Sequence, residues 1–240
     1  MTVQLIAHRG CSSLAPENTL AAVEAALQLA EVDFVEVDVH RSRDGVLVAI
    51  HDRDLQRTTN GHGLVSELDF ADLKPLHAGY PAKFQDRFLD QGIPTLEEVL
   101  EFAEKRGAGV MVEVKPAGIG ADVAELLCRR KAWEHHFIAS EHAQVLEDAR
   151  RYCSKLRLMP VAERPQEGIR LALQLPTFWI AFDNEITDRE TLQAAIQEGL
   201  IPWVWTVNDI SRAKQLIAWG AKGLITDVPQ ELNRAEKGKA

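Results

Sequence analysis

The stretch Val35-Glu36-Val37-Asp38-Val39 alternates an apolar residue with an acidic one. Side chains of a β-strand point alternately to its two faces, so the valines share one face and Glu36 and Asp38 share the other. In a closed sheet wrapped by helices, the valine face packs under the helices and the acidic face points inward. The stretch therefore predicts a barrel strand that carries two carboxylates toward the barrel interior.

Around this stretch, short β-rich segments alternate with amphipathic helical segments along the chain. The β-rich segments are Val3–Ala7, Phe34–Val39, Val46–Ile50, Val110–Val114, Phe137–Ala139, Leu156–Val161, Trp179–Phe182, Ile201–Val207 and Gly223–Ile225. This alternation predicts an α/β fold with a parallel sheet, which can be closed or doubly wound. The closed alternative is a TIM-type (β/α)8 barrel, which uses eight such strands. Because there are nine candidates for eight strands, either one short segment lies outside the barrel or the second repeat is irregular.

The 240 residues are expected to form a single domain, spanning 1–240. Residues 53–94 break the strand–helix alternation, and they contain Asn60-Gly61 and Pro75 among other turn-forming residues. Long irregular segments of this kind usually carry function. We therefore expect a small insertion after the third strand, covering the active-site face, with a short helix near Ser66–Leu73.

Composition excludes several classes of protein. The formal net charge is −9 and no basic run is present, which argues against nucleic-acid binding. The three cysteines lack metal-site spacing, which favours reduced thiols in a cytoplasmic protein. No leader-like segment is visible, and no apolar stretch reaches the ~20 residues of a membrane span, so stable membrane insertion is not expected. The sequence does not indicate an oligomeric state.

A third acidic residue repeats the alternating pattern in Val112-Glu113-Val114-Lys115, which places Glu113 and Lys115 on one face. Buried carboxylates need a compensating cation. Glu36, Asp38 and Glu113 together offer the oxygen ligands preferred by Mg²⁺ or Ca²⁺. The alternative is a set of ion-paired strand residues, for example Glu113 with Lys115.

Two histidines stand where strands are predicted to end, His8 after Leu5-Ile6-Ala7 and His51 after Val48-Ala49-Ile50. Catalytic groups of barrel enzymes sit at the carboxyl ends of strands, and imidazoles transfer protons near neutral pH. Arg9 and Lys115 could contact a phosphate, or could only pair with the carboxylates. The remaining histidines are expected to be packed or exposed without chemistry: His40, His62, His77, His135, His136 and His142.

These motifs, in this order, make the chain similar to the glycerophosphodiester phosphodiesterase family, within the phospholipase-C-like phosphodiesterase barrels. The segments that carry the resemblance are Ala7-His8-Arg9-Gly10, Pro16-Glu17-Asn18-Thr19, Glu36-Val37-Asp38, Asp44-Gly45, His51-Asp52, Thr58, Glu113-Val114-Lys115, Val204-Trp205-Thr206-Val207-Asn208 and Gly223-Leu224-Ile225-Thr226-Asp227-Val228-Pro229. Residues 117–199 match only in their strand–helix alternation.

The resemblance implies a TIM-type barrel with an insertion after the His51-Asp52 strand. It implies that Glu36, Asp38 and Glu113 hold the divalent ion and that His8 and His51 are the acid–base pair. It also implies that Arg9 and Lys115 face the phosphate, that Glu17 joins the site and that Trp205 lines it. Asn18 is expected to cap the first helix.

The implied activity is metal-dependent hydrolysis of a glycerophosphodiester, such as glycerophosphocholine, to glycerol 3-phosphate and an alcohol. Either water or the neighbouring glycerol hydroxyl could be the nucleophile. The alternatives are a lysophospholipase D acting on lipid diesters, a metal-dependent aldolase or isomerase barrel, and an inactive binding module. Family members commonly have an aromatic residue where Glu141 follows Ser140 here, which leaves the preferred alcohol open.

Overall fold

The computed structural model describes residues 3–131 and 133–232. The strands are β1 (Gln4–Ala7), β2 (Phe34–Arg41), β3 (Leu47–Ala49), β4 (Gly109–Val114), β5 (Phe137–Ser140), β6 (Arg157–Ala162), β7 (Trp179–Asp183), β8 (Ile201–Trp205) and β9 (Gly223–Thr226). The α-helices are α1 (Leu20–Leu27), α2 (Phe70–Leu73), α3 (Pro81–Phe84), α4 (Leu96–Glu104), α5 (Gly120–Arg129), α6 (Ala143–Tyr152), α7 (Pro165–Gln174), α8 (Arg189–Gln197) and α9 (Ile210–Trp219). Short 3-10 turns, η1 and η2, occupy Val65–Glu67 and Gln85–Phe88.

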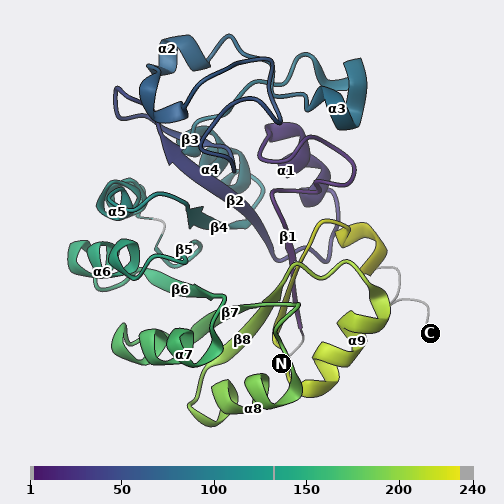
Figure 1. Ribbon diagram of the computed structural model, residues 1–240, viewed down its shortest axis with the longest axis vertical. Helices are drawn as coiled ribbons and strands as arrows, with labels where there is room; N and C mark the ends of the chain where they lie inside the picture. The colour runs from purple at the N-terminus through teal and green to yellow at the C-terminus, as the bar shows by residue number, and fades with distance from the viewer. Residues whose placement is uncertain (1–2, 132, 233–240) are drawn as a thin grey trace.

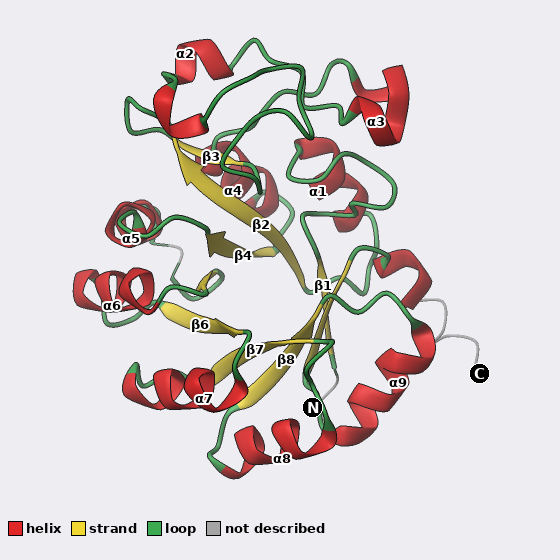
Figure 2. Cartoon of the chain, viewed as in Figure 1, coloured by secondary structure: helices red, strands yellow, loops and turns green. Residues whose placement is uncertain are grey.

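The parallel strands close into a TIM-type (β/α)8 barrel, as predicted. Their order around the barrel is β1-β9-β8-β7-β6-β5-β4-β2, and β1 pairs with β2 to complete the ring. The remaining strand, β3, pairs antiparallel with the end of β2, so the segment Val46–Ile50 is the candidate that lies outside the barrel. Helices surround the barrel, with α5 to α9 following one another around its outside (Figure 1; Figure 2).

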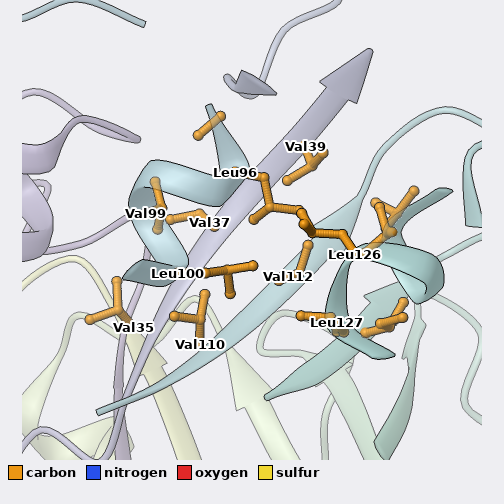
Figure 3. Packing of buried hydrophobic residues seen from close by; sticks show 14 of the residues in the cluster. Val35, Val37, Val39, Leu96, Val99, Leu100, Val110, Val112, Leu126 and Leu127 are labelled. Atoms are coloured by element: carbon orange, nitrogen blue, oxygen red, sulfur yellow. The ribbon is translucent and has the colours of Figure 1, made fainter. Parts of the chain in front are cut away.

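The two faces of β2 are packed as the alternating sequence predicts. Val35, Val37 and Val39 are fully buried against Leu96, Val99 and Leu100 of α4, and Figure 3 shows these side chains between the strand and the helix. Residues on the inward faces of the strands form a separate apolar cluster that fills the barrel, and this cluster contains Ile6, Met111, Phe137, Met159 and Trp203. The interior of the barrel is therefore a packed apolar core.

The spacings of Thr95 with Glu98 and of Thr187 with Glu190 each predict a capping box at a helix start, and the two predictions differ in their outcome. At α4 the Thr95 hydroxyl accepts from the Glu98 N–H while the Glu98 carboxylate accepts from the Thr95 N–H, which confirms the capping box. At α8 the expected cap by Thr187 is wrong, because Asp188 caps the helix by accepting from the Thr191 N–H. The Thr187 hydroxyl instead donates to the Asp183 carbonyl at the end of β7.

The segment from 53 to 94 carries η1, α2, α3 and η2 beside α1 and β3 (Figure 1). Its apolar residues pack with Val48 of β3 and with Ile50 into a small cluster, whose other members are Leu55, Val65, Leu73, Ala78 and Ile93. The single helix expected near Ser66–Leu73 is divided into η1 and α2. Within the described part of the chain, no helix is long and apolar enough to cross a bilayer.

Candidate active site

The turn after β1 is shaped so that a backbone N–H reaches a carboxylate on β2. Arg9 and Gly10 both adopt positive φ values, 56° and 78°. A Cβ atom at Gly10 would lie 2.5 Å from the backbone carbon of Ala22, so only glycine fits this close approach to α1. The tight turn directs the Arg9 N–H to Oε2 of Glu36, at 2.7 Å.

Three carboxylates meet at the carboxyl ends of β2 and β4, and we call Glu36, Asp38 and Glu113 the acidic cluster. One oxygen of each lies within 4.8 Å of the others, and all three residues are buried. The strand register causes this meeting, because Asp38 pairs directly with Glu113 across β2 and β4. The structure therefore brings together the three acids that the sequence singled out.

Two cations from neighbouring segments lie against the acidic cluster. Arg9 Nε is 3.1 Å from Asp38 Oδ2, and Lys115 Nζ is 3.0 Å from Asp38 Oδ1 and also contacts Glu113. The ion pairs to Asp38 lack the angles of hydrogen bonds, so Asp38 Oδ1 and Arg9 Nε have no hydrogen-bond partner, and neither has Glu36 Oε1. The expected ion pairing thus exists, but it leaves buried lone pairs unsatisfied.

The charges in the acidic cluster shift two pKa values in opposite directions. Burial and the negative charge of Asp38 raise the pKa of Glu36 well above its ordinary value. Burial acts on Asp38 in the same direction, but the positive charges of Arg9 and Lys115 outweigh it and hold the pKa of Asp38 below its ordinary value. Repulsion is therefore concentrated on Glu36, the carboxylate with the fewest cationic neighbours.

The acidic cluster suits a divalent cation. Three carboxylates face two positive side chains, so a negative charge is left over in a buried place. Glu36 Oε1 and Asp38 Oδ1, which accept no hydrogen bond, are hard oxygen donors of the kind that Mg²⁺ and Ca²⁺ prefer. These residues fit a divalent ion, and they offer neither the sulfur nor the imidazole ligands that favour softer metals.

His8 is oriented by a carboxylate that directly follows the last strand. Its Nδ1 lies 2.7 Å from Asp227 Oδ1, and Ser12 and Asn208 donate further hydrogen bonds to the same carboxylate. Burial raises the pKa of Asp227, but the hydrogen bond and charge of His8 more than reverse this, so the pKa lies well below its ordinary value. An ionised Asp227 accepts from Nδ1–H and leaves Nε2, 3.9 Å from Glu36 Oε2, to exchange a proton.

His51 has an equivalent carboxylate partner next to it in sequence. Its Nδ1 lies 2.7 Å from Asp52 Oδ1, and Arg57 donates to Asp52 at 2.6 Å. The hydrogen bond from Arg57 lowers the pKa of Asp52 to about 2. The ring of His40, which was expected to have no chemistry, lies 3.0 Å from the backbone carbonyl of His51 and so helps to hold the loop that carries it.

The two remaining predicted residues differ in how they join the site. Glu17 bridges two arginines, because it accepts from Arg9 at 2.9 Å and from both terminal nitrogens of Arg57 at 2.8 Å. Burial raises the pKa of Glu17, but these arginines lower it by more. Trp205 ends β8 at the same end of the barrel, and its buried indole Nε1 has no hydrogen-bond partner among the described residues.

Sequence reasoning gave no role to Asp227, Asp52 or Arg57. Asp227 directly follows β9 and Asp52 follows His51, so their positions at strand ends were a usable signal. Arg57 lies in the irregular segment, whose path no sequence pattern indicates. The role expected of Asn18 is wrong: Thr19 caps α1, while Asn18 donates to Asp38 Oδ2 at 2.8 Å and accepts from the Asp38 N–H.

Glu141, the residue in place of the expected aromatic, lies close enough to the acidic cluster for charges to interact. Burial and the charge of Glu113 raise the pKa of Glu141 above its ordinary value. The preceding Ser140 donates to the Val114 carbonyl at 2.8 Å and so ties the end of β5 to β4.

Comparison with known proteins identifies relatives that share nearly the whole chain. The sequence model of the glycerophosphoryl diester phosphodiesterase family matches residues 8–231. A glycerophosphodiester phosphodiesterase of Caldanaerobacter subterraneus subsp. tengcongensis is 32% identical over 250 residues, which cover 99% of this chain and 100% of the relative. A Bacillus subtilis glycerophosphodiester phosphodiesterase is 30% identical over 256 residues, covering 97% of this chain and 86% of that one.

Solved structures of similar proteins agree with the barrel. A phosphodiesterase of Oleispira antarctica, in complex with the product sn-glycerol-3-phosphate, superposes with a TM-score of 0.88 at 29% identity and covers 98% of this chain and 96% of its own. A glycerophosphodiester phosphodiesterase of Agrobacterium tumefaciens gives a TM-score of 0.85 at 29% identity, with 98% and 100% covered.

Proposed function

Because this chain belongs to the glycerophosphoryl diester phosphodiesterase family, we propose that it hydrolyses a glycerophosphodiester to glycerol 3-phosphate and an alcohol. The observation that carries the proposal is the arrangement at the carboxyl end of the barrel, where the buried acidic cluster lies beside two carboxylate-oriented histidines. The solved relative that holds sn-glycerol-3-phosphate supports the product. Glycerophosphocholine is the substrate that we expect to be turned over.

We propose that Glu36, Asp38 and Glu113 hold a divalent cation, Mg²⁺ or Ca²⁺. The convergence of the three buried carboxylates, with Glu36 Oε1 and Asp38 Oδ1 accepting no hydrogen bond, supports this assignment. When bound, the ion supplies positive charge that stabilises the negative charge developing on the phosphate. Arg9 and Lys115, which already border the cluster, are proposed to orient the phosphate and to offset part of that charge.

We propose that His8 and His51 divide the acid and base roles. Each has Nδ1 against a carboxylate, which favours the tautomer with a free Nε2 in the neutral ring. One Nε2 removes the proton from the nucleophilic hydroxyl, and the other, protonated, donates to the departing alkoxide. Asp227 and Asp52 hold the rings in place, while Glu17 and Arg57 hold Asp52 and Arg9. Trp205 is proposed to line the substrate.

The chain is proposed to be one domain over residues 1–240, in which residues 53–94 form an insertion that covers part of the active-site face. Contacts of the insertion with the site support this: Arg57 reaches Glu17, and Lys83 Nζ donates to the Ser12 carbonyl at 2.7 Å in the loop after β1. Residues 1, 2, 132 and 233–240 of the domain lie outside the described residues. We also infer a cytoplasmic location, with which the free thiols of the three cysteines agree.

The proposal is tested by assaying hydrolysis of glycerophosphocholine with and without a chelator, beside His8→Ala and His51→Ala. We expect activity to be lost with the chelator and restored by Mg²⁺ or Ca²⁺, and each alanine variant to lose at least about a hundredfold in kcat. Activity that survives the chelator, or full activity in both variants, would exclude this chemistry. Lysophosphatidylcholine serves as the comparison substrate. If the enzyme turned it over in preference to glycerophosphocholine, the activity would be that of a lysophospholipase D.

Trapping at short times identifies the nucleophile. Attack by the neighbouring glycerol hydroxyl forms a cyclic phosphodiester first, and water then opens it to glycerol 3-phosphate. Direct attack by water gives glycerol 3-phosphate with no cyclic phosphodiester at any time.

A further inference from the structure

An arginine in the first turn of α9 binds the loop that follows β7. Arg212 Nε donates to Asn184 Oδ1 at 2.8 Å, and one terminal nitrogen donates to the carbonyl of Asn184 at 2.8 Å and to that of Thr187 at 2.6 Å. The other terminal nitrogen donates to Gln215 Oε1 at 2.7 Å on the same helix. All four of these acceptors are neutral oxygens, so the guanidinium group holds a backbone in place and does not neutralise a charge there.

The guanidinium group is itself held by two further contacts. Its central carbon lies 5.1 Å from the centroid of the Trp219 ring, which is a cation–π contact. The Asp209 carboxylate, which caps α9, accepts from the backbone N–H of Arg212 at 2.7 Å. These contacts keep the arginine side chain in the position from which its donors reach the loop.

The loop that Arg212 binds has a shape of its own. The Asp183 carboxylate accepts from the Glu185 N–H at 2.7 Å, and the Thr187 hydroxyl donates to the Asp183 carbonyl at 2.5 Å. These internal hydrogen bonds fix the conformation of the loop but not its position relative to the helices. The three hydrogen bonds from Arg212 fix that position, because they come from a different element.

The loop in turn contacts the backbone of Trp205 at the end of β8. The Asn184 N–H donates to the Trp205 carbonyl at 2.5 Å. The pairing of β8 with β7 extends to Trp205, opposite Asp183, whereas its pairing with β9 covers Trp203 and Val204. Trp205 is therefore held from the side of β7 and of the loop that Arg212 binds.

The side chain of Trp205 faces the mouth of the barrel. Residues two apart on a strand point to the same face, and Trp203 belongs to the apolar cluster that fills the barrel. Trp205 packs against that cluster from the carboxyl end of β8 and is partly exposed. A displacement of the loop after β7 would therefore move an indole at the end of the barrel where the acidic cluster lies.

We propose that Arg212 is a positioning residue for substrate binding, which acts through Asn184 and the backbone of Trp205. The inference rests on the proposed function, in which Trp205 lines the bound glycerophosphodiester. Arg212 binds the loop and not the substrate. Its loss should therefore weaken substrate binding without changing the acid–base chemistry.

The test is a double-mutant cycle in the full-length chain, with KM and kcat for glycerophosphocholine as the readout. Arg212→Gln should raise KM by about tenfold and leave kcat within about twofold, because a contact made equally in the ground state and the transition state contributes to binding alone. In Trp205→Ala, which lacks the indole, the addition of Arg212→Gln should change KM by less than about twofold, because the two residues act through one contact.

Arg150 provides the matched control for a loss of stability. It also binds a backbone, since it donates to the carbonyls of Ser154, Leu156 and Leu175 at 2.5, 3.0 and 3.2 Å. These carbonyls lie at the amino ends of β6 and β7, away from the site. Arg150→Gln should lower the urea midpoint as Arg212→Gln does, and it should leave KM unchanged.

Nitrogen-15 NMR tests the same inference without an assay of activity. The chain has five tryptophans, each with one indole N–H signal, and Trp205→Phe identifies the signal of Trp205. We expect this signal to shift in Arg212→Gln and to stay in place in Arg150→Gln.

Several results would overturn the inference. These are a KM that Arg212→Gln leaves unchanged, a rise of KM that is equal with and without the Trp205 indole, a similar rise in Arg150→Gln, or a Trp205 signal that does not move in Arg212→Gln. If the unmodified chain fails to hydrolyse glycerophosphocholine, the proposed function is wrong, and the NMR signal alone decides whether Arg212 positions Trp205.

Discussion

Two groups of charged side chains, at opposite ends of the barrel, differ in how completely they are paired. At the amino ends of β4 and β5, His136 Nδ1 accepts from the Val110 N–H at 2.9 Å and Nε2 lies 3.2 Å from Glu104 Oε1. Arg130 donates to both oxygens of Glu104, at 3.2 and 2.6 Å. We call Glu104, Arg130 and His136 the paired triad.

The acidic cluster at the carboxyl ends of the strands is also held by several contacts, but its hydrogen bonding is incomplete. Glu36 Oε1 and Asp38 Oδ1 are buried without hydrogen-bond partners, whereas each ring nitrogen of His136 and each oxygen of Glu104 has one. Unsatisfied buried charge is destabilising, so it persists where something outside the chain satisfies it. For these two groups of charged side chains, full pairing thus agrees with a structural role, and the missing hydrogen bonds agree with the proposed cation site.

We expect the largest effect on activity from Glu36→Gln, and this effect distinguishes the acidic cluster from the paired triad. The substitution keeps the shape and the acceptor for the Arg9 N–H, but it removes a negative charge from the acidic cluster. We expect kcat/KM for glycerophosphocholine to fall by about three orders of magnitude, because charge stabilisation by a metal contributes several kcal/mol. The matched change Glu104→Gln in the paired triad should leave activity within about twofold. Comparable losses of kcat/KM in Glu36→Gln and Glu104→Gln would show that the acidic cluster and the paired triad do not differ in function.

A smaller loss is expected from Asp227→Asn, which tests the orientation of His8. Asn208 and Ser12 both donate to the Asp227 carboxylate, so an amide placed there must turn its NH₂ group toward some existing donor. If that group faces His8 Nδ1, the ring takes the tautomer with Nε2 protonated. We expect kcat to fall roughly a hundredfold with little change in KM. An unchanged kcat, measured under saturating substrate, would show that Asp227 does not position the ring.

His136→Phe should lower stability and leave activity unchanged, because it breaks the paired triad and leaves the acidic cluster intact. The Val110 N–H loses its acceptor while it stays buried, which destabilises the fold by about 2 kcal/mol. Urea unfolding measures this change, and hydrolysis in the absence of urea should be unaffected. His136→Gln, which can again accept from Val110, should recover part of the loss. A drop in kcat/KM without a drop in stability would contradict the structural role.

The smallest expected effect is a pH dependence of stability that originates in His136. Burial lowers the pKa of His136 below its ordinary value near 6.5, so the unfolded chain takes up this proton first as the pH falls. The contribution of the neutral ring to stability is therefore complete above about pH 6.5 and is lost as the pH falls through the lower folded-state pKa. The urea midpoint is measured at pH 7.5 and at a pH below 6. Its fall between these two pH values should be smaller in His136→Gln than in the unmodified chain. Equal slopes would exclude His136 as the source.

Alternation of strands and helices was enough to predict a parallel α/β sheet, the family resemblance was needed to predict that it closes into a barrel, and alternation within β2 and β4 was enough to predict which acids meet. The parallel sheet and the meeting of the acids follow from local periodicity, since strand register then brings Asp38 beside Glu113 without further information. The sequence could not tell that β3 lies outside the barrel, because Val46–Ile50 has the same apolar character as a barrel strand and its partner is chosen by tertiary packing.

The partners of the site residues were the least predictable part. Asn18 precedes a helix and has the composition of a cap, but its αL backbone, with φ of 60°, turns the amide to Asp38. Arg57 is separated from Glu17 by forty positions and lies in a segment without periodicity, so only the three-dimensional path joins them.

The account rests most heavily on the acidic cluster as a site for one divalent cation. Isothermal titration of the chelator-treated chain with Mg²⁺ and with Ca²⁺, repeated on Glu36→Gln and on Glu104→Gln, tests this directly. We expect saturable binding of one ion in the unmodified chain and in Glu104→Gln, and binding weakened by at least about tenfold in Glu36→Gln. Undiminished binding in Glu36→Gln, or no binding of either ion to the unmodified chain, would contradict it.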